Sequence, residues 1–599
     1  MSTAILTGQP VLGSSLEGDL RSLGFDVRLA SDAADAETLL AAVPADQRVA
    51  VVDTRFVGHV HALRLGLTDP RFDAAAIPGA VTARPAARPA LSRALRTAAG
   101  DASNGSVVVG IVADRVAEAL ETDLHRPELG ELVAVVPRDP QARNEARQSV
   151  AAIDDEAIRL RTAVKARDGF FTTYCISPYS RYIARWCARR GLTPNQVTTA
   201  SLLTALVAAG CAATGTRAGY VVAGLLLLFS FVLDCTDGQL ARYSLQYSKL
   251  GAWLDATFDR AKEYAYYAGL ALGAARGGDD VWALALGAMV LQTCRHVVDF
   301  SFNEANHDAT ANTSPTAALS GRLDSVGWTV WLRRMIVLPI GERWAMIAVL
   351  TAVTTPRITF YVLLIGCAFA ATYTTAGRVL RSLTRKAHRT DRAARALADL
   401  ADSGPLAEGM ARLLKKLPAH PPFGSRTLVA LQGAVILVAA AWFAPYGSWW
   451  PVLAAAFYAF VSGAAVALPL KGALDWLVPP VFRAAEYGTV LVLAAKAEVN
   501  GALPAAFGLV GAVAYHHYDT VYRIRGNAGA PPHWLVRAIG GHEGRTLLVT
   551  VLAALLAATD FKVALTALAV AVALVVLVES IRFWVSSGAP AVHDEGEPA

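Results

Sequence analysis

The sequence predicts a polytopic α-helical membrane protein with a soluble α/β domain at its N-terminal end. Apolar runs rich in Ala, Leu and Val recur between residues 196 and 583, and residues 1–190 contain none. Each run is close to the roughly 20 residues that a helix needs to cross a bilayer. Of the 599 residues, 54% are hydrophobic and 17% are charged, and the mean hydropathy is +0.39. This composition excludes an ordinary soluble protein.

Residues 1–150 have the pattern of a soluble α/β domain. Short β-branched runs alternate with amphipathic stretches at 59–67 and 89–99, which predicts a parallel sheet covered by helices. The runs lie at 4–8, 49–53, 106–113 and 132–137. The loop after the first run carries Gly8, Gly13 and Gly18, a spacing too wide for a dinucleotide fingerprint, and it has no nearby lysine for a phosphate loop.

A linker with an interfacial helix is expected at 151–195, because 167–195 mixes aromatic side chains with arginines. Six spans follow in a membrane domain at 196–385, and they are expected at 196–215, 218–236, 250–273, 280–300, 341–355 and 357–379. Basic clusters flank the first and sixth spans, which favours a cytoplasmic location for both. With no cleavable signal at its start, the chain is expected to have its N-terminus, active site and C-terminus in the cytoplasm and its spans in the plasma membrane.

A second hydrophobic block at 425–585 also reads as six spans. It follows a polar cytoplasmic linker at 386–424 and precedes a tail, 586–599, that is expected to be disordered. The stretch FRAAEYGTVLVLAA from Phe482 resembles DRAKEYAYYAGLAL from Asp259, and a second match pairs Trp331 with Trp534. The two blocks then form a degenerate repeat, unless Ala- and Leu-rich helices match here by chance.

The charge and the cysteines exclude other classes of site. The net charge is +6, but the basic residues lie beside apolar runs, so a membrane surface explains them better than nucleic acid does. The six cysteines show no CxxC or similar spacing, which indicates neither a zinc site nor a disulfide framework.

Four aspartates are expected at the cytoplasmic ends of the second and third spans. Asp234 and Asp237 are three residues apart, and Asp255 and Asp259 are four apart, so each pair lies on one face of its helix. Four converging carboxylates need a compensating charge, and hard oxygen ligands favour magnesium, manganese or calcium. This pattern indicates phosphoryl transfer. The alternative is that the aspartates only cap helices and pair with Arg242, Lys249 and Arg260.

The full string DxxDGxxARx8GxxxDxxxD resembles, without a departure, the signature of the CDP-alcohol phosphotransferase family, and the similarity covers about 165–385. The resemblance implies six spans and transfer of a phosphoalcohol group from a CDP-alcohol to an alcohol acceptor, with release of CMP. It also implies two Mg2+ ions, which Mn2+ could replace, and a general base at Asp259. The metal ligands would be Asp234, Asp237, Asp255 and Asp259, and the nucleotide-binding residues Gly238, Ala241, Arg242 and Gly251.

The domain order resembles that of bifunctional di-myo-inositol phosphate phosphate synthases, in which a nucleotidyltransferase domain precedes the membrane domain. Here the sequence AILTGQPVLG departs from that pattern, because it lacks the glycine-rich loop with its basic residue. The resemblance therefore implies an N-terminal domain of this type that has lost catalysis.

Basic side chains near the spans suggest a phosphorylated acceptor such as an inositol phosphate. The acceptor-binding candidates are Arg260, Arg295, His296 and Arg343, each of which could instead anchor a helix at the interface. The donor would be CDP-diacylglycerol or a CDP-polyol, and a homodimer is allowed. The alternatives are a phosphatidylglycerol phosphate-type synthase and, from another class, a transporter or scaffold with two repeats.

The second hydrophobic block keeps ionisable residues near its helices, and we expect it to be a structural or dimer-like partner of the catalytic block. These residues are Arg483, Glu486, His516, His517, Asp519, Arg523, His542, Glu543 and Arg545.

Overall fold

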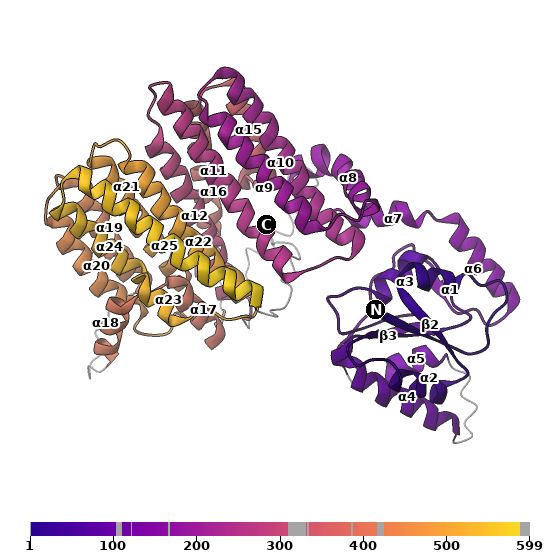
Figure 1. Ribbon diagram of the computed structural model, residues 1–599. Helices are drawn as coiled ribbons and strands as arrows, with labels where there is room; N and C mark the ends of the chain where they lie inside the picture. The colour runs from indigo at the N-terminus through magenta and orange to yellow at the C-terminus, as the bar shows by residue number, and fades with distance from the viewer. Residues whose placement is uncertain are drawn as a thin grey trace. The chain divides into compact units, whose positions relative to one another are not determined.

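The computed structural model describes residues 2–103, 111–120, 122–165, 168–309, 331, 335–384, 387–415 and 425–586 (Figure 1). It divides into two compact units. The first unit contains Met1–Ala166, Tyr179–Pro194 and Thr236–Tyr247, and the second contains the remaining helices. The first unit thus joins the N-terminal domain to the helix Ser177–Arg189 and to the last turns of the helix Arg217–Ser244.

The soluble domain is built on a six-stranded mixed sheet with the strand order β2-β1-β3-β6-β5-β7. The strands are β1 (Ser2–Thr7), β2 (Phe25–Ala30), β3 (Arg48–Asp53), β5 (Ala74–Ile77), β6 (Ala80–Ala83) and β7 (Leu124–His125). Strand β1 runs parallel to β2 and β3, whereas β6 is antiparallel to both β3 and β5. The expectation of a parallel sheet is therefore wrong for β6. Pro78 and Gly79 reverse the chain there, with a φ of +78° at Gly79, where glycine is favoured.

The strands expected near the end of this domain are only partly present. Of the 106–113 run, residues 106–110 lie outside the described residues, and its last residues begin helix α5 (Val112–Ala119) instead. The 132–137 run forms only β8 (Ala134–Val135), which pairs with β4 (Val57–Gly58) in a separate two-stranded sheet. The helices predicted at 59–67 and 89–99 are confirmed as α3 (Val60–Leu67) and α4 (Arg88–Ser103).

Helices cover both faces of the main sheet because its central strands are apolar on both sides. Val49 and Val51 pack with α2 (Ala33–Ala41), α4 and α5, whereas Ala50 and Val52 pack with α1 (Leu16–Ser22) and α3. Figure 1 shows these two helical layers on opposite sides of the strands. The alternation follows from the two-residue period of a strand. The expected α/β domain is confirmed.

Helices are present at all six positions expected for the first set of spans. They are α9 (Pro194–Ala213), α10 (Arg217–Ser244), α11 (Lys249–Arg276), α12 (Trp282–Asn306), α15 (Ile340–Val353) and α16 (Pro356–Thr384), and together we call them the first helical block. By length and apolar character alone, α9, α10 and α16 are able to cross a membrane. Helix α15 has 14 residues and is about 21 Å long, shorter than the roughly 30 Å of hydrocarbon in a bilayer.

The second helical block, 391–586, has six helices in the part where six spans were predicted. They are α19 (Arg426–Phe443), α20 (Trp450–Val466), α21 (Val478–Lys496), α22 (Ala502–Arg525), α24 (Gly541–Leu555) and α25 (Ala558–Ser586). By length and apolar character alone, α19, the stretch Asp475–Lys496 that contains α21, and α25 are able to cross a membrane. The predicted linker is itself largely helical, with α17 (Asp391–Ala401) and α18 (Pro405–Lys415). The predicted disordered tail, from residue 587 on, lies outside the described residues.

The two helical blocks share one hydrophobic core. Tyr267 and Met289 of the first block and Tyr487 and Val510 of the second are buried in the same cluster, and α12 packs against α21 and α22. Large apolar side chains such as Ile365 are exposed on the outer helices, as expected for a surface that faces lipid. The blocks therefore support each other's packing.

Candidate active site

The acidic motif spans the end of α10 and the start of α11. Leu245 has a φ of +53° just after α10 ends. The Ser248 hydroxyl accepts a hydrogen bond from the Gly251 backbone N–H at 2.9 Å and caps α11. This short connection makes the two helix ends neighbours, so that aspartates on one can face aspartates on the other.

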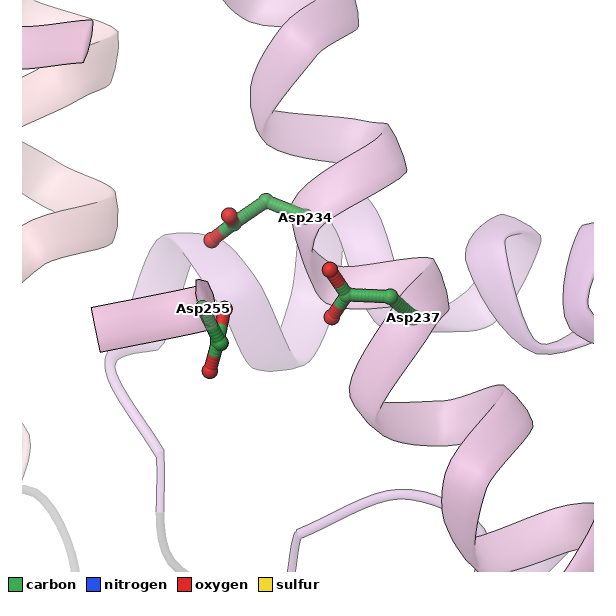
Figure 2. A group of neighbouring side chains, drawn as sticks. All are labelled: Asp234, Asp237 and Asp255. Carbon is green, nitrogen blue, oxygen red and sulfur yellow. The ribbon is translucent and has the colours of Figure 1, made fainter. Parts of the chain in front are cut away.

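Three of the four predicted carboxylates converge. Oxygens of Asp234, Asp237 and Asp255 all lie within 4.8 Å of one another, and Asp237 is only 4% exposed. Figure 2 shows Asp234 and Asp237 leaving α10 on one side, toward Asp255. Negative charges this close repel each other, so the group favours a bound cation.

The fourth carboxylate, Asp259, is joined to the cluster by a lysine that the sequence analysis did not single out. The Lys262 ammonium is fully buried, lies 2.9 Å from Asp259 Oδ1 and also pairs with Asp234. The ammonium further donates to Ser201 Oγ at 3.2 Å. The signal was present in the sequence, because a lysine three residues after Asp259 shares its helix face within an apolar stretch.

The donor set fits a hard divalent cation. Lys262 neutralises one of the four negative charges, so the site keeps a strong excess of carboxylate oxygens, the ligands that such cations prefer. Of the alternative partners expected for the aspartates, Arg260 pairs with Glu263 at 2.9 Å and Arg242 donates to the Ala163 carbonyl at 2.6 Å. The side chain of Lys249 lies outside the described residues.

The motif's glycines differ in what surrounds them. A Cβ added at Gly251 would lie 2.5 Å from Asn195 Oδ1 and 2.7 Å from Ser248 Oγ, so a larger residue there would displace these two side chains. A Cβ at Gly238 would lie 3.5 Å from both terminal nitrogens of Arg242 and meet nothing closer. The Arg242 guanidinium therefore lies along the Gly238 face of α10, where Ala241 is half-buried beside it.

Two of the predicted acceptor residues meet at one buried carboxylate. Glu263 forms ion pairs with Arg260 Nη1 at 2.9 Å and with Arg343 Nε at 3.0 Å. Arg295 donates to the Val337 carbonyl, and its Nε and Nη1 are buried without a hydrogen-bond partner among the described residues. His296 does not share this carboxylate: its Nδ1 contacts the Tyr518 hydroxyl and its Nε2 contacts the Gln292 amide.

The second helical block repeats this arginine-glutamate-arginine triad. Glu486 receives Arg483 Nη1 at 2.9 Å and Arg545 Nε at 2.6 Å, and all three side chains are buried. In both triads the first arginine lies three residues before the glutamate on one helix, and the second arginine comes from a later helix. This match of contacts agrees with the repeat suggested by the sequence.

A second carboxylate, Asp402, bridges the two arginines of the second triad. Asp402, between α17 and α18, lies 2.8 Å from Arg545 Nη2, 3.4 Å from Arg483 Nη1 and 3.1 Å from His516 Nε2. Although burial raises it, the pKa of Asp402 is held well below its ordinary value by Arg545 and His516. In the part of the chain that the structure describes, no second carboxylate bridges Arg260 and Arg343 in this way.

A further feature is shared by the two blocks. Glu342 accepts the Phe171 backbone N–H at 3.2 Å, at the start of the helical stretch that leads through a π-helical turn (Thr172–Ile176) into α8 (Ser177–Arg189). Glu543 accepts the backbone N–H groups of Gly404 and Ala407 at the start of α18. In each block a glutamate one or two residues before the second arginine of the triad therefore accepts hydrogen bonds at the start of an earlier helical stretch.

Comparison with known proteins bears on this site. Residues 191–372, which contain the acidic motif, match the CDP-alcohol phosphatidyltransferase family model. Residues 391–599 match a second model, described as a family of unknown function (DUF5941).

Among curated proteins, the chain is 32% identical over 114 residues to a bifunctional IPC transferase and DIPP synthase of Aquifex aeolicus. It is 32% identical over 130 residues to a phosphatidylinositol phosphate synthase of Streptomyces avermitilis, and 32% identical over 113 residues to an archaetidylinositol phosphate synthase of Pyrococcus horikoshii. These matches cover 19%, 20% and 19% of this chain and 26%, 51% and 58% of the relatives, respectively. The chain thus matches less than two thirds of each relative's length.

Proposed function

We propose that the protein transfers a phosphoalcohol group from a CDP-alcohol to an alcohol acceptor that carries its own phosphate, with release of CMP. The observation that carries this proposal is the convergence of Asp234, Asp237 and Asp255 within the family signature. The names of the relatives favour an inositol phosphate as the acceptor. CDP-diacylglycerol and a CDP-polyol remain the two candidate donors.

The metal ligands of this proposal are Asp234, Asp237 and Asp255, with Asp259 at the edge of the site. Bound magnesium or manganese would supply charge neutralisation for the donor's diphosphate. The chain itself contributes Arg242, whose planar group of donors suits a phosphate, and a start of α11 at which Gly251 lies beside Asn195 of α9.

Asp259 is the proposed general base for the acceptor hydroxyl. Its Oδ1 lies 2.9 Å from Lys262 Nζ, and the ammonium favours the ionised, proton-accepting form of the carboxylate. Lys262 also fixes the position of the carboxylate, because the lysine is fully buried and is held by Ser201 and Asp234 as well. The base is thereby oriented before the acceptor arrives.

The second triad supports an anion site for the acceptor. In the second helical block, the Asp402 carboxylate is held between Arg483 and Arg545. We infer that the acceptor's phosphate takes the corresponding place between Arg260 and Arg343, with Arg295 as a further donor. Two arginines that already share Glu263 keep additional N–H groups for such an anion.

The second helical block is, in this proposal, a degenerate copy that has kept the triad and lost the metal ligands. Asp255 and Asp259 correspond to Val478 and Phe482, which are both fully buried apolar residues. In this block the Asp402 carboxylate occupies the position between Arg483 and Arg545 that corresponds to the proposed anion site. The block then acts as the structural partner of the catalytic half, and the active site faces the cytoplasm.

A direct test uses the full-length protein in nanodiscs with labelled CDP-diacylglycerol and magnesium. We expect CMP release with an inositol phosphate as acceptor, and much slower release with inositol or glycerol 3-phosphate. Asp237→Asn and Asp259→Asn are expected to abolish release, whereas Asp560→Asn, an exposed aspartate at the start of α25, serves as the matched control and keeps full activity.

The same experiment separates the competing functions. Preference for glycerol 3-phosphate would identify a phosphatidylglycerol phosphate-type synthase. CMP release from a CDP-polyol but not from CDP-diacylglycerol would show that the product is a soluble phosphodiester. If Asp259→Asn retained full turnover, the proposed base would be wrong, and no CMP release with any donor and acceptor would favour the transporter or scaffold.

A further inference from the structure

The last turns of α10 are held by a short helix of the soluble part of the chain. Helix α7 (Asp155–Thr162) and residues Thr236–Tyr247 belong to the same compact unit. Glu156 Oε1 accepts the Tyr243 hydroxyl at 2.7 Å. Arg159 Nε donates to the Tyr243 carbonyl at 2.7 Å, and its guanidinium carbon lies 3.5 Å from the centre of the Tyr243 ring. Helix α7 thus contacts the hydroxyl, the ring and the backbone carbonyl of Tyr243.

The same helix contacts the motif arginine. The carbonyl of Ala163, the residue that caps α7, accepts a hydrogen bond from Arg242 Nε at 2.6 Å. This contact fixes the rotation of the guanidinium plane, and both terminal nitrogens then lie along the Gly238 face of α10. A guanidinium that is already oriented loses less conformational entropy when it binds a diphosphate.

Helix α7 is anchored on its other side to the soluble domain. Ile158 is buried in the core formed by α1, α3 and the sheet, whereas Leu160 packs with Ala163 and Tyr243. Glu156 also lies within ion-pair distance of Arg185 and Arg189 of α8, at 4.0 and 3.8 Å. Burial, with Arg64 nearby, lowers the pKa of Arg159 to about 10, which leaves it charged at neutral pH.

We propose that α7 positions the nucleotide-binding end of α10, with Glu156 and Arg159 as positioning residues for the cytidine diphosphate part of the donor. These residues act through Tyr243 and Arg242 and do not touch the substrate. They lie outside the matched residues 191–372 and act on the last turns of α10, which belong to the same compact unit as α7. This inference rests on the proposed function.

The test compares Arg159→Met with Arg161→Met in the full-length protein in nanodiscs. Both changes remove one arginine from α7, but Arg161 is 59% exposed and pairs with the exposed Glu131. Arg159→Met is expected to raise the KM for the CDP-alcohol and the Kd for CMP by about tenfold, which is about the worth of one charged hydrogen bond that a displaced Arg242 no longer makes to the diphosphate. Its kcat and its KM for the acceptor should stay within about twofold of the unaltered protein, and Arg159→Lys should restore part of the CMP affinity.

A second pair of variants tests the contact itself. Glu156→Ala and Tyr243→Phe remove the two ends of one hydrogen bond, so their effects on CMP affinity should be clearly less than additive. The thermal midpoint of each variant shows whether the fold is intact.

Each outcome decides between the two proposals. Equal CMP affinities for Arg159→Met and Arg161→Met, or a fall in kcat with an unchanged donor KM, would overturn the positioning role. CMP binding without turnover in the unaltered protein would overturn the proposed transfer but leave the positioning role to be judged from the CMP affinities. An unaltered protein that binds no CMP would overturn both.

Discussion

Replacing Lys262 with methionine tests whether a buried ammonium balances the acidic site. Methionine keeps the length and the apolar stem of lysine and removes only the charge. At 2.9 Å from Asp259 Oδ1, the attraction is about 6 kcal/mol for an effective dielectric constant of about 20. The cost of desolvating the ammonium offsets part of this attraction. Since Asp234 and Asp259 both lose their cation, we expect the free energy of unfolding to fall by about 3–5 kcal/mol.

The assay is denaturation by SDS in mixed micelles, with and without saturating magnesium. Because a bound cation can take over the neutralisation, the loss in Lys262→Met should be clearly smaller with magnesium than without it. Lys471→Met is the matched control, since Lys471 pairs with Asp391 at 2.7 Å but both side chains are largely exposed. The double variant Lys262→Met/Asp234→Asn should regain part of the lost stability.

Two results would refute this reasoning. If Lys262→Met were no less stable than Lys471→Met, the buried ammonium would not be compensating the carboxylates. If magnesium had the same effect on Lys262→Met as on the unaltered protein, the lysine and the cation would not share the same carboxylates.

Three further predictions concern other parts of the chain. Magnesium should raise the thermal midpoint of the unaltered protein but not that of Asp237→Asn, and an equal shift in both would argue against a cation at the three carboxylates. Burial, with Arg159 and Arg64 nearby, lowers the pKa of His61 to about 4. The unfolded chain therefore binds a proton that the folded domain does not, and up to about 3 kcal/mol of stability is lost as the pH falls from about 6.5 to about 4. Limited proteolysis of the soluble domain across this pH range should show the loss. In His61→Phe the rate of proteolysis should depend less on pH. Asp402→Asn leaves Glu486 as the one carboxylate that pairs with both Arg483 and Arg545 among the described residues, and it should lower the free energy of unfolding by about 3–5 kcal/mol in SDS denaturation. A loss no greater than that of the exposed control Asp560→Asn would mean that the second triad does not depend on Asp402.

Local patterns were sufficient for most of the helices and for the spacing of the acidic motif. The six helices of the first block begin and end within a few residues of the predicted spans, except that α10, α12 and α16 extend five to eight residues further. Apolar runs underestimate the length of helices that continue into polar residues. The strand order of the soluble domain was not predictable in the same way. Strand β6 is antiparallel because a tight turn at Gly79 reverses the chain, and the apolar runs alone carry no strand direction.

Residues whose role depends on partners distant in sequence were found only in part. Arg260 and Arg343 were identified as basic residues near spans, but their common partner Glu263 was not. Asp402 lay in a segment expected to be a linker, yet it is buried between two arginines of the second block. Such contacts depend on which helices pack together, and a single sequence does not specify that packing.

The sequence by itself determined the spacing of the carboxylates and predicted the chemistry that we propose, because carboxylate oxygens gathered from two helix ends favour hard cations, which bind phosphates. Only the tertiary structure decided how that charge is balanced and which segments are joined to the site. Lys262 reaches Asp234 across the space between two helices, and α7 reaches Tyr243 from a distant part of the chain. The physical reason is that helical periodicity fixes which side chains share a face, whereas burial and packing select the partner that each buried charge finds.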